Sequence, residues 1–320
     1  MTHFAKTLLN LSLFAVFAGG TFSTAASPRK GNGERYVDLG TAAAGFQASV
    51  RKGAGQVTVV REIDRLIFYP DKRYAFFDGV RINLSYPLLM RHGKPCLAKT
   101  DCDSVITPFL SPGKRYRQQI VTIVLDPGHG GRDRGTAGSR LLEKNVTLNL
   151  AERVAKILRT YGYKVILTRT RDVWIPLDAR SATANRARAD LFVSIHANSA
   201  LDRSVSGIET FCLTPEGAAS SNAGTPVSRR YPGNRNNSRN FLLAYRVQRS
   251  LLKRTGAFDS GVKFARFAVL REVNCPAVLI ETSFLSNWKE ETNLRNPAYL
   301  DKVARGIAAG ILNYHRSLAR

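Results

Sequence analysis

The chain has 320 residues, with 48 lysines and arginines against 24 aspartates and glutamates, so its formal net charge is +24 at pH 7. Apolar residues make up 44% and charged residues 22%, values that exclude a disordered tail or a fibre. This length is typical of about two domains. The excess of positive charge predicts an anionic partner: nucleic acid, lipid headgroups or an acidic polymer.

Residues 1–26 have the features of an export signal. Lys6 supplies the positive charge, residues 8–17 are apolar but shorter than a membrane span, and residues 23–26 offer small side chains for cleavage. A buried first helix is the alternative interpretation. Export predicts a periplasmic, envelope or extracellular protein with no stable membrane insertion after cleavage. Genomic nucleic acid would then be a poor partner.

Residues 27–33 are a linker by composition, and residues 34–112 predict a small β-rich domain. Stretches rich in β-branched and aromatic residues alternate there with turn signals such as Asp78-Gly79. These stretches are 57–60, 65–69, 74–77 and the hairpin return arm 81–85. Their rhythm resembles the copper amine oxidase-like N-terminal modules that are fused to secreted enzymes, and it implies no oxidase chemistry.

Residues 118–318 show strands alternating with helices. This pattern predicts an α/β domain with a mostly parallel, twisted sheet flanked by helices. Strands are expected at 120–125, 164–168, 191–195, 207–213, 264–270 and 277–280. Helices are expected at 145–161, 176–189, 241–252 and 299–312. The polar residues 214–239 are expected to form a long surface loop.

Four polar residues stand at positions that a sheet edge would bring together. His129 and His196 directly follow predicted strands, and the carboxyl ends of such strands form the ligand-binding edge of open α/β sheets. Glu143 begins the helix after the His129 loop. Glu281 follows five mostly apolar strand residues, where a carboxylate is costly unless it is paired or binds a metal.

Two histidines and a glutamate form the donor set of a catalytic zinc site, which leaves the fourth tetrahedral position open. A second glutamate that does not bind the metal can accept and return a proton. Each residue also has a plainer interpretation. A strand-end histidine is usually structural, Glu143 can stabilise a helix N-terminus, and Glu281 can pair with an arginine. Their joint arrangement favours the metal site.

Five segments resemble, in order and spacing, the motifs of the zinc-dependent N-acetylmuramoyl-L-alanine amidases of the amidase_3 family. They are residues 123–131, 143–145, 167–172, 194–198 and 281–287, and the resemblance covers residues 120–315. It implies that His129, Glu143 and His196 bind one zinc ion (Zn²⁺). It also implies that Glu281 is the general base and acid. The implied reaction is hydrolysis of the amide between N-acetylmuramic acid and L-alanine in peptidoglycan.

The resemblance also extends to residues around these motifs. Arg169, Arg180 and Asn185 match the family pattern, and we expect them to support the site structurally. Asn198 is expected to orient His196 or to contact substrate. Ser283 departs from the pattern, because the family usually has glycine at that position, and its small side chain is expected to be tolerated.

The loop at 214–239 bears on regulation and on substrate binding. Some family members carry a long helical insert that plugs the active site until a partner removes it. This loop is too short and too rich in Gly, Pro and Ser for such a helix, so regulation by a plugging insert is not expected, and the sequence does not reveal an activator. Its arginines, Arg235 among them, are expected to contact acidic stem peptides or glycan. A solvated loop is the alternative.

The sequence therefore predicts an exported, monomeric zinc amidase whose partner is peptidoglycan. Two alternatives remain within this fold: an inactive amidase-like protein that binds the wall, and a zinc peptidase that cuts within the stem peptide. A nucleic-acid binder is disfavoured by the export signal and by the lack of a recognition motif. Cys96 and Cys102 could form a disulfide in an exported protein. Cys212 and Cys275 are expected to be buried thiols.

Overall fold

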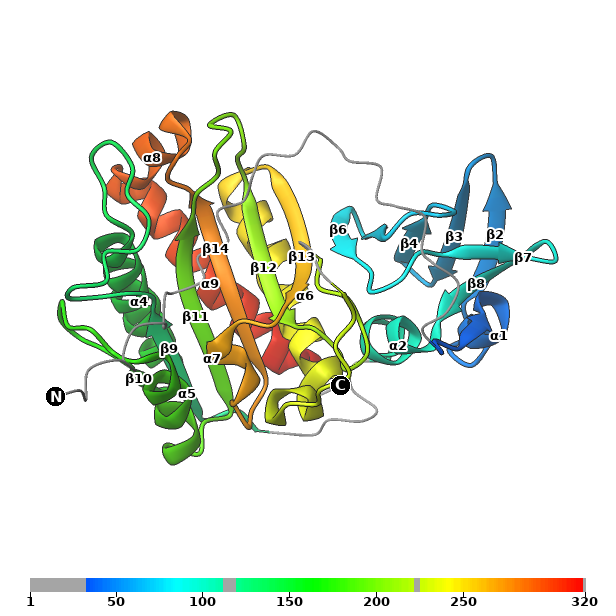
Figure 1. Ribbon diagram of the computed structural model, residues 1–320, viewed down its shortest axis with the longest axis horizontal. Coiled ribbons are helices and arrows are strands. Elements are labelled where there is room, and N and C mark those ends of the chain that lie inside the picture. The colour runs from blue at the N-terminus through cyan, green and yellow to red at the C-terminus, as the bar shows by residue number, and fades with distance from the viewer. Residues whose placement is uncertain (1–32, 112–118, 222–224, 319–320) are drawn as a thin grey trace, which may run out of the picture.

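The computed structural model describes residues 33–111, 119–221 and 225–318, and Figure 1 shows their arrangement. The expected export signal, and all but the last residue of the expected linker, lie outside the described residues. Within those ranges, none of the helices combines the length and the apolar character that a membrane crossing requires.

The larger part of the described chain is an α/β unit built on one sheet (Figure 1). Across this sheet the strands run in the order β10, β9, β11, β14, β12, β13. Their bounds are Thr122–Pro127 (β9), Lys164–Leu167 (β10), Leu191–Asn198 (β11), Ile208–Leu213 (β12), Asp259–Ala265 (β13) and Ala277–Phe284 (β14). Neighbouring strands are parallel except β12 and β14, which are antiparallel. The predicted α/β fold with a mostly parallel sheet is confirmed.

Helices cover both faces of this sheet because its strands are apolar on both sides. One face carries the long helices α4 (Glu143–Thr160), α6 (Asn237–Thr255) and α9 (Pro297–Leu318). The other carries the short helices α5 (Leu177–Arg186) and α7 (Ala268–Arg271). The apolar cluster under α5 and α7 includes Ala277 and Leu279 of β14 and stops before Glu281. Glu281 therefore lies beyond the part of this face that the helices fill.

Several element boundaries differ from the prediction. The strand expected at 264–270 ends at Ala265, and residues 268–271 form α7 instead. Val269 and Leu270 are buried against the sheet as part of a helical turn, which an apolar run does not distinguish from a strand. The expected loop at 214–239 is interrupted by a 3₁₀ helix, η2 (Pro232–Asn236), and α6 begins directly after it. Helix α8 (Trp288–Leu294) was not predicted.

The described N-terminal residues are β-rich, as predicted. A meander of antiparallel strands comprises β2 (Ser49–Gly53), β3 (Gln56–Arg61), β4 (Asp64–Phe68), β5 (Tyr74–Phe77) and β6 (Val80–Asn83). A second, three-stranded sheet comprises β1 (Tyr36–Asp38), β7 (Leu89–Arg91) and β8 (Lys94–Ala98). Short helices complete the unit: α1 (Leu39–Ala44), α2 (Lys99–Asp101), the π-helix η1 (Cys102–Ile106) and α3 (Thr107–Leu110).

The meander continues the α/β sheet instead of standing apart from it. Val262 of β13 pairs with Ile82 of β6, which extends the sheet to 11 strands. Helix α6 packs under the junction, with the Phe241 ring 6.2 Å from the Phe77 ring. Buried residues of both parts belong to one hydrophobic cluster. The boundary expected between residues 112 and 118 falls outside the described residues.

The four cysteines are free and buried. The disulfide considered for Cys96 and Cys102 is therefore absent. Cys96 lies on β8 and directs its thiol toward the Lys94 carbonyl oxygen, 3.7 Å away, whereas Cys102 begins η1. Cys212 and Cys275 are buried thiols as predicted, and burial raises the pKa of the Cys275 thiol to about 12.

Candidate metal centre

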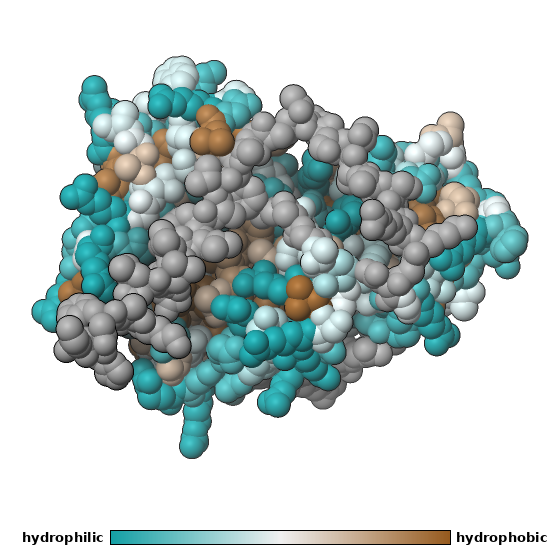
Figure 2. All heavy atoms as spheres, viewed as in Figure 1, coloured by the Kyte–Doolittle hydropathy of each residue, from teal (hydrophilic) through white to brown (hydrophobic). Residues whose placement is uncertain are grey.

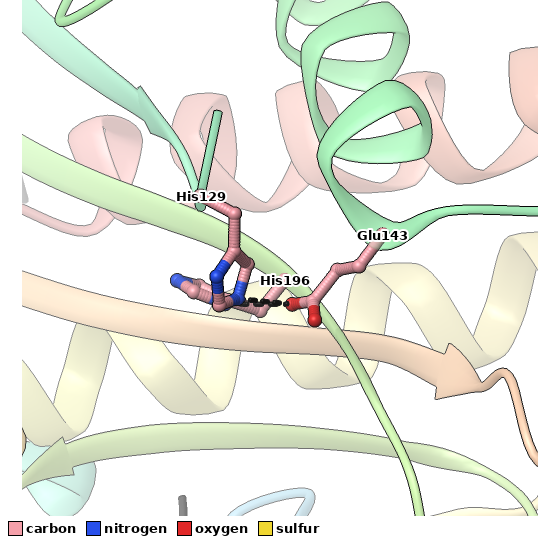
Figure 3. A group of neighbouring side chains, drawn as sticks. All are labelled: His129, Glu143 and His196. Carbon is pink, nitrogen blue, oxygen red and sulfur yellow. Dashed lines mark hydrogen bonds and ion pairs between the residues drawn. The ribbon is translucent and has the colours of Figure 1, made fainter. Parts of the chain in front are cut away.

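Three side chains from separate elements converge at the carboxyl ends of β9 and β11. His129 follows β9, His196 lies near the end of β11, and Glu143 is the first residue of α4. Figure 3 shows the three side chains pointing toward one another. In the parallel register, His196 of β11 stands directly beside Glu281 of β14. The structure therefore brings together all four residues that the sequence singled out for metal binding and proton transfer.

A single carboxylate oxygen lies between the two imidazoles. Oε1 of Glu143 is 3.0 Å from Nε2 of His129 and 2.8 Å from Nδ1 of His196. One potential ligand atom from each residue lies within 4.8 Å of the other two. Two imidazole nitrogens and a carboxylate oxygen at this spacing are a donor set that a divalent transition metal accepts.

The charges of the three residues depend on one another. Burial disfavours the charged imidazole of His129, but Asp133 and Glu143 outweigh burial and raise its pKa to about 9. Burial likewise opposes ionisation of Glu143, but hydrogen bonds from both histidines prevail and hold the pKa of its carboxyl far below the usual range. The buried carboxylate of Glu143 is therefore balanced by the positive charge that His129 carries at neutral pH.

Glycines let the backbone approach the centre closely. A Cβ on Gly128 would lie 2.3 Å from Cε1 of His196. Gly135 has a φ of +65°, and a Cβ there would lie 2.5 Å from Oε2 of Glu143. Side chains at these positions would collide with His196 and Glu143, so only glycine fits at positions 128 and 135. The glycines thus leave the space in which the three donors lie together.

The His129 turn is held in a conformation that few residues adopt. His129 has a φ of +61°, which is unfavourable for a residue with a side chain. Nη2 of Arg180 donates to the His129 carbonyl oxygen at 2.8 Å, and Nη2 of Arg169 donates to the Gly128 carbonyl oxygen at 2.8 Å. Oδ1 of Asp133 lies 2.9 Å from Nδ1 of His129, which leaves Nε2 to face Glu143.

A buried ion pair anchors this turn to the sheet. Nη1 of Arg180 lies 2.8 Å from Oδ1 of Asp126, and both side chains are almost fully buried. The hydroxyls of Thr168 and Ser194 also donate to Asp126, at 2.6 and 2.7 Å. Burial alone would raise the pKa of Asp126, but Arg180 and the two hydroxyls outweigh it and lower that pKa.

Glu281 carries its carboxyl group into a site crowded with negative charge. Its Oε2 is buried and has no hydrogen-bond partner in the described part of the chain. Burial raises the pKa of Glu281 well above the usual range, Glu143 and Glu209 raise it further, and Lys263 opposes them. A carboxyl group in this setting can hold a proton near neutral pH.

Glu209 and Lys263 were not predicted from the sequence. Glu209 of β12 pairs in register with Glu281, and its Oε1 forms an ion pair with Nζ of Lys263. Nδ2 of Asn198 donates to Oε2 of Glu209 at 3.2 Å, so this amide contacts a carboxylate beside Glu281. In the sequence, Glu209 stands out only as the one charged residue of the mostly apolar strand 208–213. That pattern does not reveal that it lies beside Glu281 and pairs with Lys263.

Two other residues lie at the opposite end of the sheet. Arg235 sits in η2, whose Gly233 packs against the Leu270 carbonyl of α7. Asn185 accepts a hydrogen bond from the Asn274 backbone, just before β14 begins. The structure does not bring Arg235 to the His129 edge. Strand β12 is antiparallel to β14, so the loop that follows β12 leaves the sheet at the end opposite to His129.

The loop that leads into Glu143 is held by Glu291 of α8. Its carboxylate accepts hydrogen bonds from Oγ of Ser139 and from the backbone N–H groups of Arg140 and Leu141, at 2.6–2.9 Å. Burial opposes ionisation, but these donors outweigh it and lower the pKa of Glu291. Because this pKa is lower in the folded protein, the gain in stability is present at neutral pH. It is lost as acid protonates the carboxylate.

Glu291→Ala is therefore expected to lower the free energy of unfolding by about 1–2 kcal/mol at neutral pH, because three partly buried hydrogen bonds lose their charged acceptor. Urea unfolding at pH 7 measures the loss. Glu291→Gln is the matched control, since it keeps one acceptor oxygen and is expected to lose less. Equal stability of the alanine variant and the wild type would show that this contact does not hold the loop.

Comparison with known proteins places these features in context. The family described as N-acetylmuramoyl-L-alanine amidase matches residues 123–313. The amidase AmiC of Escherichia coli O6:H1 is 33% identical over 250 residues, which are 68% of this chain and 58% of AmiC. The amidase LytC of Bacillus subtilis is 37% identical over 195 residues, 61% of this chain and 36% of LytC. The chain thus spans about half the length of these relatives.

Solved structures show the same similarity. The catalytic domain of CwlV from Bacillus (Paenibacillus) polymyxa superposes with a TM-score of 0.52 at 33% identity, over 61% of this chain and 98% of that domain. AmiC2 of Nostoc punctiforme superposes with a TM-score of 0.53 at 33% identity, over 61% and 97%. Both proteins are N-acetylmuramoyl-L-alanine amidases.

Proposed function

This chain belongs to the N-acetylmuramoyl-L-alanine amidase family, and on that basis we propose that it is an exported enzyme acting on peptidoglycan. It hydrolyses the amide between the lactyl group of N-acetylmuramic acid and L-alanine of the stem peptide. The observation that carries the proposal is the convergence of His129, Glu143 and His196 beside Glu281 at the open edge of the sheet.

His129, Glu143 and His196 would hold one zinc ion in this enzyme, because two imidazoles and a carboxylate leave a coordination position open. When bound, zinc polarises the scissile carbonyl and increases the acidity of the attacking water. Asp133 keeps the His129 ring oriented, and the carbonyl contacts of Arg169 and Arg180 keep its backbone in place.

Glu281 transfers the proton during hydrolysis. Its carboxylate accepts a proton from the attacking water as the water oxygen bonds to the carbonyl carbon. The same carboxyl then delivers that proton to the alanine nitrogen as the C–N bond breaks. Burial and the neighbouring carboxylates favour its protonated form, which suits the second step.

The excess of positive charge fits a substrate that carries carboxylates. The formal net charge is +24, and the face seen in Figure 2 is mostly hydrophilic, with apolar residues scattered over it. We expect this charge to hold the protein on the acidic polymer and to speed encounter with it.

Digestion of purified peptidoglycan tests the proposal. We expect mass spectrometry to find intact stem peptides with a free L-alanine amino group, together with glycan that has lost its peptides. Truncated stem peptides would instead indicate a peptidase. Binding to the wall without any product would indicate an inactive amidase-like protein.

Metal removal provides the control for this experiment. Treatment with EDTA is expected to stop product release, and added Zn²⁺ is expected to restore it. Full activity of the metal-free protein, verified by elemental analysis, would contradict the role of His129, Glu143 and His196.

A further inference from the structure

One face of the 11-stranded sheet continues from the metal centre into the β-rich part of the chain. Glu281 of β14 pairs with Glu209 of β12, and Glu209 pairs with Gly261 of β13. The next strand is β6, where Arg81 stands beside Gly261. A Cβ on Gly261 would lie 3.2 Å from Cγ of Arg81, so the glycine leaves room for the arginine side chain on this face.

Three aromatic rings follow Arg81 on the same face. Tyr74 and Phe76 lie on β5, where Phe76 pairs with Arg81, and Tyr69 follows β4. We call these three residues the aromatic platform. Their ring centroids lie 5.5 to 6.2 Å apart, and the Arg81 guanidinium lies 4.8 Å from the Tyr74 ring centroid.

The platform is not part of the hydrophobic core. The alternate residues of β5, Ala75 and Phe77, point to the other face and are 0% exposed. Tyr69, Tyr74 and Phe76 are only partly buried. In an antiparallel sheet with one solvated face, polar residues are expected at these positions. The three rings therefore leave part of their apolar surface exposed on this face.

Basic residues extend the same face beyond the platform. Phe76 pairs with Ile67 of β4, and this row continues through Thr58 of β3 to Arg51 of β2. Arg51, Lys52 and Arg65 line a hollow at this end, and Asp64 is the one acidic residue among its lining residues. The outer end of the face is therefore positively charged.

We propose that this face is an extended binding surface for the glycan strand of peptidoglycan, well away from the bond that is cut. Aromatic faces pack against the C–H faces of sugar rings, and arginines pair with stem-peptide carboxylates. Four strand spacings separate β14 from β5, which puts the platform roughly 19 Å from Glu281. Only a polymer reaches both places at once.

This inference rests on the proposed function, so its test uses two substrates. Tyr74→Ala/Phe76→Ala is compared with the wild type on insoluble peptidoglycan and on a soluble disaccharide-peptide too short to reach the platform. We expect kcat/KM on the polymer to fall at least tenfold and kcat/KM on the soluble fragment to stay within twofold. Tyr161→Ala, which removes an exposed ring at the end of α4, is the matched control.

A second variant covers the case in which the aromatic variant does not fold. Arg51→Gln/Arg65→Gln changes two exposed side chains, and it is expected to weaken cosedimentation with insoluble peptidoglycan several-fold. If either folded variant matches the wild type on the polymer, the surface is not used and the inference is wrong. Competition by duplex DNA but not by soluble glycan strands would also overturn it. A wild type that cuts neither substrate would instead contradict the proposed function.

Discussion

Glu281→Gln is expected to lower the rate of peptidoglycan hydrolysis by about 10²–10⁴-fold, the range for loss of a general acid–base group. The amide of glutamine fills the same space but cannot accept the proton of the attacking water. Because Glu281 is outside the cluster of His129, Glu143 and His196, zinc content is expected to be unchanged. Stem-peptide release and elemental analysis measure the two quantities.

Glu152→Gln, an exposed change on α4, is the matched control and is expected to be fully active. If Glu281→Gln retained its activity, the proton would have to move through another group. Glu209 would be the next residue to replace, because it pairs with Glu281 in register.

Arg180→Leu is expected to lower the free energy of unfolding by about 3–5 kcal/mol, because it leaves the buried carboxylate of Asp126 without its cation. The change also removes the donors to the Pro127 and His129 carbonyl oxygens. Zinc affinity is expected to fall as well, since His129 would lose the contact that holds its unfavourable φ. Urea unfolding and zinc titration measure these effects.

Adding Asp126→Leu to the Arg180→Leu variant separates the effect of the unpaired buried charge from the effect of the lost donor to the His129 carbonyl. Removing both charges is expected to recover much of the stability, because no unpaired charge stays buried. Zinc affinity is expected to stay low, because the His129 carbonyl still lacks its donor. A loss below about 1 kcal/mol in Arg180→Leu alone would mean that water or another group replaces the guanidinium.

The metal centre could be predicted from sequence because its residues sit where local patterns end. His129 follows β9 and His196 lies near the end of β11, where the rule about strand ends places both histidines. Glu143 is found separately, as the first residue of the helix that follows the His129 loop. The rule about strand ends could not predict that Glu209 lies beside Glu281 or that Arg235 lies far from His129. Both depend on β12 being antiparallel to β14, and strand direction is set by distant pairing, which local sequence does not record.

The β-rich meander was also predictable, since its strands alternate and its turns carry Asp and Gly. Its junction with the α/β sheet was not. That junction pairs Ile82 with Val262, which lie far apart in the chain, and both look like ordinary buried strand residues. The α7 segment was misassigned for a related reason, because a short apolar run fits a buried strand and a helical turn equally well.

The junction between β6 and β13 also affects solubility. A strand at the margin of a sheet exposes unpaired backbone groups and invites other chains to add to it. On its outer side β13 meets Ile82, and further along Ser221 donates its backbone N–H to the Phe264 carbonyl oxygen at 2.8 Å. The first strands of the chain thereby shield the last exposed strand of the α/β sheet. An α/β unit prepared without them would expose the unpaired edge of β13, and intermolecular β-pairing would compete with its folding.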